Sequence, residues 1–310
     1  MIRKRVVFLL GAGASYGYGY PSGADLKAAL SSIDAEKMAL MNAAGFKQEQ
    51  VHDFQRRLAA SGLNSVDAFL LRNPSTVGIA KIRIAQELAM AERRDAEGNG
   101  VRPWGRETWY QYLFSQFMDD GDLAAFGNNQ CSFVTLNYDR SLEYALTSML
   151  SNAYGTTWER CAAIVAEIPI VHLHGSPGPL PGFVRGETGI AYGEIGDDPS
   201  IKRSAASILT LGEAGSEAQY ALASELLEGA DVIFSLGFGY HTEVISRLKL
   251  ACDLRPEIHG TCQGHTQSEV YAVAARFLPR RFEEVRRESN LRGDGPAVDY
   301  IRASVQLFQG

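Results

Sequence analysis

The sequence RKRVVFLLGAGASYGYGYPSG, residues 3–23, places a short apolar run directly before a cluster of glycines. The run Val6–Leu10 is too short for an independent helix and is bounded by turn-forming residues, so it predicts a buried strand. The glycines that follow it are Gly11, Gly13, Gly17 and Gly19. A glycine loop after a buried strand lets backbone N–H groups approach a ligand closely, and phosphate is the usual one. The alternative is a tight turn that binds nothing.

The composition is that of an ordinary globular protein. At 310 residues, with 45% hydrophobic and 21% charged residues, the chain can form one large domain or one domain with a helical insertion. The formal net charge of −6 gives no general electrostatic reason to bind nucleic acid or an anionic membrane. Arginines and glutamates interleave over residues 280–292, which predicts a solvated helix face. No apolar stretch approaches the ~20 residues that span a bilayer, so we expect a cytoplasmic protein.

The cysteines give no sign of a metal site or a disulfide framework. They are Cys131, Cys161, Cys252 and Cys262, and none of them belongs to a C-x-x-C pair. This spacing disfavours a zinc ribbon, and the number is low for a disulfide scaffold. We therefore expect free, mostly buried thiols.

Strands and helices alternate along the second half of the chain. Short apolar strands are predicted at 132–137, 168–175 and 230–239, with amphipathic helices between them. Residues 23–129 have apolar positions at three- and four-residue spacing, which predicts a helical insertion whose first helix is capped by Ser22. The alternation predicts an α/β protein, 1–310 as a single domain, with a Rossmann-like parallel sheet and helices on both faces.

Each predicted strand ends in small or polar residues. These ends are Gly11–Ser15, Thr135–Asp139, His172–Gly175 and Ser235–Glu243. In a doubly wound sheet the carboxyl ends of parallel strands lie at one edge, where ligands bind. We therefore expect four separate segments to bring polar side chains to one crevice.

The glycine spacing departs from the dinucleotide fingerprint of dehydrogenases. Gly11, Gly13 and Gly17 form G-x-G-x-x-x-G, which is one residue longer than G-x-G-x-x-G. About 20 residues further on, where a ribose-binding carboxylate would end a second strand, Asp34 and Glu36 fall in helical sequence. The pattern therefore argues against hydride transfer.

The four strand ends together resemble the sirtuin family and its bacterial sirtuin-like relatives. GAGAS at 11–15 is similar to the family's first NAD-binding loop, and TLNYD at 135–139 to its T-x-N-x-D segment. HLHG at 172–175 is similar to the H-G of the catalytic histidine, and SLGFGYHTE at 235–243 to the loop that closes on the cofactor ribose. The motifs occur in the family's order and together fix about 25 residues.

Two differences narrow the resemblance. Sirtuin deacetylases have a zinc ribbon of two C-x-x-C pairs, which this sequence lacks, and a G-x-P-D-F-R-type stretch where residues 19–25 read GYPSGAD. The zinc-less variant, with GAGAS followed by Y-P-S-G and helices, resembles a bacterial group implied to hydrolyse NAD during antiphage defence. The resemblance therefore implies an NAD hydrolase that releases nicotinamide and ADP-ribose, uses NAD as substrate and needs no metal.

Two residues are the catalytic candidates, Asn137 and His174. The amide of Asn137 can hold a ribose hydroxyl or the attacking water, because it donates and accepts without adding charge. Histidine exchanges protons near neutral pH, so His174 can accept a proton from a ribose hydroxyl or from water. Cleavage of the nicotinamide–ribose bond passes through an oxocarbenium-like sugar, and its leaving group is already cationic, so positioning and a base are needed rather than a strong acid.

The cofactor-binding candidates come from the glycine loop and the other strand ends. They are Gly11, Ala12, Gly13, Ala14, Ser15, Pro21, Asp25, Asp139, Gly237 and Gly239. The backbone N–H groups of residues 12–15 and the Ser15 hydroxyl suit a pyrophosphate. The alternative for Gly237 and Gly239 is that they are simple turn glycines.

Several neighbouring residues have a structural alternative. Asp139 could instead cap the helix that begins near Arg140. We expect His172 to lie on the opposite face from His174 in a structural role. The tyrosines at 16, 18 and 20 are expected to pack under the insertion rather than to form a wall near nicotinamide, and His241 could face either the site or solvent.

Unregulated NAD loss would poison the cell, so the resemblance implies a gated effector. We expect a homo-oligomer and a separate sensor protein, either a nucleic-acid-handling ATPase or an Argonaute-like protein, with no direct binding of nucleic acid or membrane. Two other functions remain open. One is a non-catalytic module that binds NAD or ADP-ribose and controls a partner. The other is an NAD-dependent protein deacetylase or ADP-ribosyltransferase.

Overall fold

The computed structural model describes residues 1–63, 65–97, 108–118, 122–250, 256–261, 266, 268–269, 272, 291–292 and 297–304. Of the predicted charged helix face over 280–292, residues 280–290 lie outside the described residues, as do Cys252 and Cys262, whereas Leu291–Arg292 form a strand rather than a helix. The other two cysteines, Cys131 and Cys161, are free and buried, as predicted. None of the described helices combines the length and the apolar character needed to cross a membrane.

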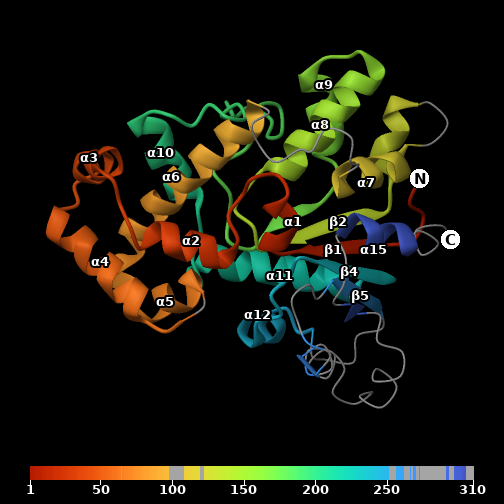
Figure 1. Cartoon of the computed structure of the whole chain (residues 1–310). Helices are drawn as coiled ribbons and strands as arrows, with labels where there is room; N and C mark the ends of the chain where they lie inside the picture. The colour runs from red at the N-terminus through yellow and green to blue at the C-terminus, as the bar shows by residue number, and fades with distance from the viewer. Residues whose placement is uncertain are drawn as a thin grey trace.

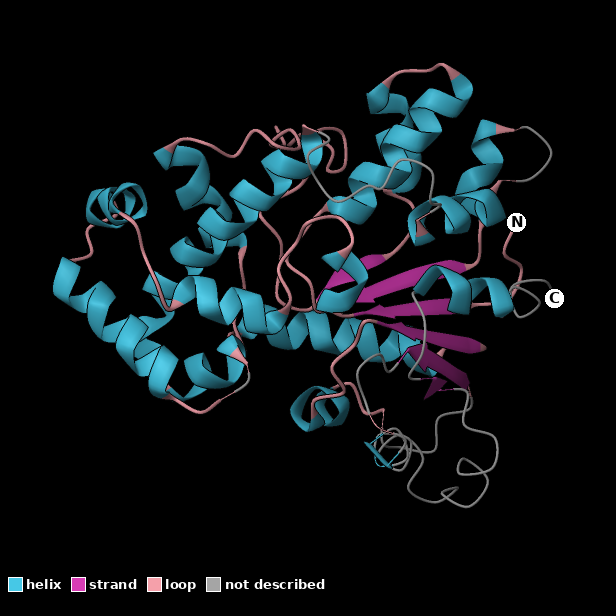
Figure 2. Cartoon of the chain, in the orientation of Figure 1, coloured by secondary structure: helices cyan, strands magenta, loops and turns pink. Residues whose placement is uncertain are grey.

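A parallel sheet forms the centre of the molecule (Figures 1 and 2). Its described strands are β1 Val6–Leu10, β2 Cys131–Thr135, β3 Ile170–His172, β4 Val232–Leu236, β5 Glu257–Thr261 and β6 Leu291–Arg292. They lie in the order β3-β2-β1-β4-β5-β6, and each neighbouring pair is parallel. This is the strand order of dinucleotide-binding doubly wound sheets, and it confirms the predicted Rossmann-like α/β class.

The central strands are apolar because both faces of the sheet are covered. β1 and β4 are buried along their whole length. Phe8 of β1 stacks on Phe133 of β2 and on Phe234 of β4, with ring centroids 5.2 and 5.7 Å apart. Alternate residues of β1 serve two separate cores, so that Phe8 belongs to one and Leu9 to the other.

Helices pack on both faces of this sheet (Figure 2). The core that contains Phe8 is completed by residues of α7 Trp109–Phe117, α8 Ser141–Tyr154, α9 Trp158–Val165, α10 Asp198–Ser207 and α15 Ala297–Ala303. The core that contains Leu9 is completed by α11 Ala214–Glu228 and α12 Thr242–Arg247. Gly229 is the C-terminal cap of α11.

The segment between β1 and β2 is helical, as its periodicity predicts. Its further elements are α1 Ala12–Tyr16, α2 Gly23–Leu30, α3 Ala35–Ala43, α4 Gln48–Ala60, α5 Val66–Arg72, η1 Pro74–Thr76, α6 Val77–Ala96 and η2 Leu123–Asn128. Figure 1 shows α2 to α5 beyond the end of the sheet at which β1 finishes. Ser22 caps α2 as predicted, because its hydroxyl accepts from Asp25 N and the Asp25 carboxylate accepts from Ser22 N.

Several elements differ from the sequence-based expectation. β2 covers Cys131–Thr135 rather than 132–137, β4 covers Val232–Leu236 rather than 230–239, and β5 and β6 were not predicted. The glycine stretch after β1 is not an open loop, because residues 12–16 form the one-turn helix α1 with Gly11 as its N-cap. The third strand was expected over 168–175 but contains only 170–172. It ends early because Gly175 turns the chain with a φ of +68°, and the His174 carbonyl accepts from Leu209 N at 2.8 Å rather than from a sheet neighbour.

Candidate active site

A cavity of about 550 Å³ lies at the carboxyl end of the sheet. The segments that follow β1, β2, β3 and β4 form one side, and residues of α2 and α5 form the other. The strand order reverses between β1 and β4, and this is the position at which doubly wound sheets bind ligands. The volume is in the range of small-molecule and cofactor sites.

Most of the candidate residues line this one cavity. They are Gly11, Ala12, Gly13, Ser15, Pro21, Asn137, Asp139, His174, Gly237 and Gly239. Ala14 and Asp25 lie outside its lining. The Ala14 carbonyl accepts from the indole Nε1 of Trp109 at 2.9 Å, and Asp25 is exposed on α2, where it completes the capping box.

The glycines after β1 and β4 pack against each other. Gly13 N donates to Gly237 O at 3.1 Å, and Gly11 N donates to Leu236 O at 3.0 Å. A Cβ on Gly237 would lie 2.2 Å from Ala14 N, and this glycine has a φ of +59°. Backbone-to-backbone contact between the two loops therefore requires these glycines. The amide of Gly13 is engaged within the protein, and so is that of Ala14, which donates to Gly11 O at 2.9 Å.

Asn137 is held by the glycine loop across the strand ends. Its Nδ2 donates to Gly11 O at 3.0 Å and to Ser15 Oγ at 2.9 Å, and its backbone N donates to Thr135 Oγ1 at 3.0 Å. Both side-chain N–H groups are therefore used, and the side-chain oxygen Oδ1 of Asn137 is the atom that a ligand can engage. The side chain thus offers an acceptor for a hydroxyl or a water.

Asp139 lies at the start of α8 and at the wall of the cavity. Its Oδ1 accepts from the Ser141 backbone N at 3.2 Å and from the Ser141 hydroxyl, so it holds the start of α8. It also lines the cavity. Burial raises the pKa of the Asp139 carboxyl above its ordinary value, although hydrogen bonds from Ser141 and Ser15 oppose the rise.

His174 is buried after the end of β3 and is paired with a carboxylate. Its Nδ1 lies 3.1 Å from Asp67 Oδ1, and the Tyr138 hydroxyl donates to the same Oδ1 at 3.1 Å. Burial raises the pKa of the Asp67 carboxyl, but the charge and hydrogen bond of His174 and the hydrogen bond of Tyr138 outweigh it, so the pKa is lowered. Because an ionised carboxylate only accepts, His174 Nδ1 is the donor. Its Nε2 is then the ring nitrogen that can act as a base.

The sequence motifs do not identify Asp67. It is on α5 of the insertion, 107 residues before His174, and it also lines the cavity. Its only local signal is that of an acidic residue in the first turn of a helix capped by Ser65, which is common at helix starts. Its role becomes visible only when the insertion is placed against the sheet.

His172 has a different environment from His174. Strand alternation does not explain this, because residues two apart share a face; the reason is that β3 ends at His172, so that His174 lies beyond the strand. Its Nδ1 bonds Asn137 O at 3.0 Å and its Nε2 bonds Glu143 Oε1 at 2.8 Å. Burial lowers the pKa of His172, but the Glu143 charge and these hydrogen bonds outweigh it and raise the pKa. This histidine lies outside the cavity lining and ties the end of β3 to α8.

The tyrosines at 16, 18 and 20 and His241, whose positions the sequence left open, differ in their surroundings. Tyr18 packs, with its ring stacked on Tyr110 at 4.1 Å. Tyr20 is buried and also lines the cavity, whereas Tyr16 is 61% exposed. His241 lines the cavity from the segment before α12 and is exposed at its mouth.

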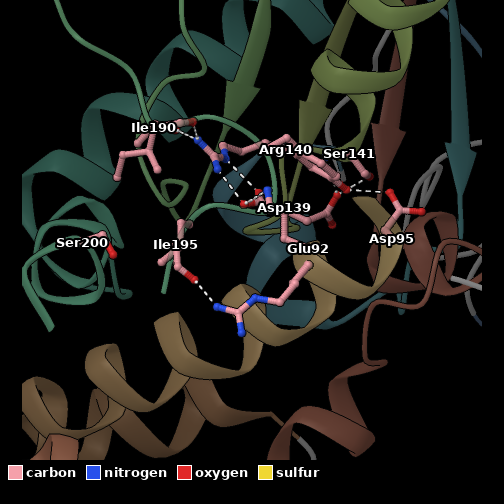
Figure 3. Close-up of polar contacts among 12 residues, drawn as sticks. Glu92, Asp95, Asp139, Arg140, Ser141, Ile190, Ile195 and Ser200 are labelled. Atoms are coloured by element: carbon pink, nitrogen blue, oxygen red, sulfur yellow. Dashed lines mark hydrogen bonds and ion pairs between the residues drawn. The ribbon is translucent and has the colours of Figure 1, made fainter. Parts of the chain in front are cut away.

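Arg140, which directly follows Asp139, anchors the chain beyond His174 (Figure 3). Its Nε and Nη2 donate to Glu92 Oε1 and Oε2 at 2.9 and 2.7 Å, and both side chains are almost fully buried. Its Nη1 donates to the carbonyls of Gly178 and Ile190 at 3.1 and 2.9 Å. One arginine therefore joins the end of β2 to α6 and to the irregular segment after β3.

The charged lining of the cavity is acidic. Its ionisable carboxyl and imidazole groups belong to Asp67, Asp139, His174, His241 and Glu243. Among the described lining residues there is no lysine or arginine. Such a lining favours a ligand whose reacting part is cationic and disfavours an additional phosphate beside it.

No protein-family model and no curated protein matches this chain. Several solved Sir2 structures are similar to it. A Sir2 enzyme is 13% identical, with 99% of this chain and 93% of that chain covered and a TM-score of 0.40. A Sir2 homologue in complex with NAD is 13% identical, with 98% and 90% covered and a TM-score of 0.42. A Sir2 homologue variant in complex with ADP-ribose is 17% identical, with 97% and 93% covered and a TM-score of 0.34.

Proposed function

We propose that this protein is an NAD glycohydrolase that cleaves NAD to nicotinamide and ADP-ribose. The observation that supports the proposal is the meeting of Asn137 and His174 in one cavity at the point where the strand order reverses. The two side chains come from different strand ends and leave the groups that the reaction needs, a carbonyl acceptor and a ring nitrogen.

The proposed reaction is a hydrolysis in which the bond between the nicotinamide nitrogen and ribose C1′ breaks. The bonding electrons leave with nicotinamide, and the sugar becomes oxocarbenium-like. The side-chain oxygen Oδ1 of Asn137 positions the attacking water or a ribose hydroxyl. His174 Nε2 accepts the proton that the water loses on bonding to C1′. The acidic lining stabilises the positive charge of the sugar in the transition state.

The same lining suits NAD better than NADP. A 2′-phosphate is ordinarily held by a neighbouring arginine, and the described lining residues include neither arginine nor lysine. We therefore propose NAD as the substrate.

The biological setting is proposed from the resemblance of the four sequence motifs. It is that of a gated, homo-oligomeric effector of bacterial antiphage defence in the cytoplasm. A separate nucleic-acid-handling ATPase or Argonaute-like protein would act as its sensor. Gating would keep the NAD pool intact until the sensor responds.

The test is NAD consumption by the purified chain, with nicotinamide and ADP-ribose quantified. We expect turnover in the wild type and losses of about 100-fold or more in both Asn137→Ala and His174→Ala. The matched control is His52→Ala, because His52 is an exposed histidine on α4, outside the cavity. Equal turnover in all four proteins would contradict the proposed site. NAD binding without turnover would point either to a gated enzyme that needs its sensor or to the non-catalytic module, and the search would move to the partner.

A further inference from the structure

We propose that Asp67 is a positioning residue for His174, supplied by the helical insertion to hold the imidazole as the Nδ1–H tautomer. The inference rests on the proposed function for its meaning in catalysis. Its geometric basis, the contact between the two side chains, is independent of the substrate.

In this contact one carboxylate oxygen of Asp67 accepts hydrogen bonds from His174 and from Tyr138. Asp67 Oδ1 lies 3.1 Å from His174 Nδ1 and 3.1 Å from the Tyr138 hydroxyl. The Tyr138 ring stands edge-on to the imidazole, with centroids 5.7 Å apart and planes at 73°. The imidazole is therefore held by a hydrogen bond and by an aromatic edge. Its remaining nitrogen, Nε2, is the one left for proton transfer.

The hydrogen bond selects one tautomer of a buried ring. A neutral imidazole has one N–H, and a carboxylate next to Nδ1 requires that the hydrogen be there. The side chain of His174 is 3% exposed and that of Asp67 20%, so water does not replace this partner easily. Without the carboxylate, the ring could adopt the Nε2–H form, which cannot accept a proton from water at that atom.

Asp67 reaches the sheet because α5 is docked by its other residues. Val66, Phe69 and Leu70 are buried, and the Phe69 ring packs edge-on against Phe54 of α4 with centroids 6.0 Å apart. The base of the proposed reaction therefore depends on the insertion as well as on the sheet. A shift of α5 would remove the partner of His174 while leaving the strand ends intact.

The first test reads the tautomer directly and needs no activity. Nitrogen-15 NMR of the imidazole, with the His174 signal assigned by its loss in His174→Gln, is recorded at about pH 9, where histidine is ordinarily neutral. We expect the Nδ1–H form in the wild type and in Tyr138→Phe, and a shift toward the Nε2–H form in Asp67→Asn. An Nε2–H wild type, or an Asn variant with an unchanged tautomer, would overturn the proposal.

The second test separates positioning from binding. We expect Asp67→Asn to lower kcat for NAD by about 10- to 100-fold with KM changed by less than about threefold, and Asp67→Glu to recover part of kcat. The matched control is Asp53→Asn, the same substitution at a half-exposed residue of α4 that lies in the same insertion and outside the cavity. A kcat equal to that of this control would overturn the role of Asp67. Absence of turnover from every protein, the wild type included, would bear on the gate or on the proposed function and not on Asp67, and the NMR result would still decide on the tautomer.

Discussion

Asn137 Nδ2 lies 2.9 Å from Ser15 Oγ, so a side chain after β2 is bonded to the first helix after β1, across 122 residues of sequence. The bond joins two of the four strand-end motifs beneath the cavity. Ser15 is also hydrogen-bonded to Asp139, so the hydroxyl links the amide and the carboxyl. The orientation of Asn137 therefore depends on an intact helix α1.

Removal of the Ser15 hydroxyl tests this link. Ser15→Ala leaves one N–H of Asn137 without its acceptor in a buried site, so we expect the free energy of unfolding to fall by about 1–3 kcal/mol. We also expect NAD turnover to fall, because the amide loses one of its two anchors. Urea denaturation and product formation measure the two effects. The control is Ser115→Ala, an exposed serine of α7, and equal losses in the two variants would contradict the link.

The contact between the two glycine loops predicts that one added methyl group at Gly237 lowers the free energy of unfolding strongly. Gly155 and Gly237 have nearly the same φ, +60° and +59°, but a Cβ on Gly155 meets nothing within 4 Å. We expect Gly155→Ala to cost about 1–2 kcal/mol for the left-handed backbone alone. Gly237→Ala should cost about 1–3 kcal/mol more, because its Cβ strikes Ala14 N. Denaturant unfolding measures both variants, and equal costs would mean that the loops are not in close contact.

The pairing of His172 with Glu143 predicts a stability difference that depends on pH. The folded state raises the pKa of His172, so the pair stabilises the fold fully below the ordinary histidine value of about 6.5. This contribution is lost as pH rises through the higher folded pKa. We therefore expect Glu143→Gln to destabilise the protein more at about pH 6 than at about pH 9. The exposed Glu159→Gln should show no such trend, and a pH-independent loss in Glu143→Gln would contradict the assignment.

The buried pair of Arg140 and Glu92 predicts a larger effect than any surface pair. Glu92→Gln would leave the Arg140 cation buried without its counter-charge, and we expect a loss of about 3–5 kcal/mol in the free energy of unfolding. The control is Asp231→Asn, which breaks the exposed Arg5–Asp231 pair and should cause a much smaller change. Thermal and urea unfolding compare the two. Similar losses would show that the buried pair does not hold the segment after β3.

The fold class was predictable because it depends on local pattern. Apolar runs such as Val6–Leu10 and Val232–Leu236 are short, buried on both faces and followed by glycines, and these features are typical of central parallel strands. The ends of such strands meet at one edge by topology alone, so the positions of Asn137 and His174 near each other followed from the order of the motifs. Helix α1 was missed, because a glycine-rich stretch predicts an open loop better than a helical turn.

The sequence by itself determined the strands β1 to β4, the helical insertion and the two principal side chains of the candidate site, because each is encoded within a few neighbouring residues; β5 and β6 were not predicted. Only the tertiary structure decided which hydrogen-bonding atoms of the site are engaged within the protein and which remain for a ligand. Gly13 uses its amide on Gly237, and His174 uses Nδ1 on Asp67, a residue of the insertion with no distinguishing local pattern. Contacts between residues more than 100 positions apart depend on how whole elements pack, and that information is spread over the entire core rather than written at either partner.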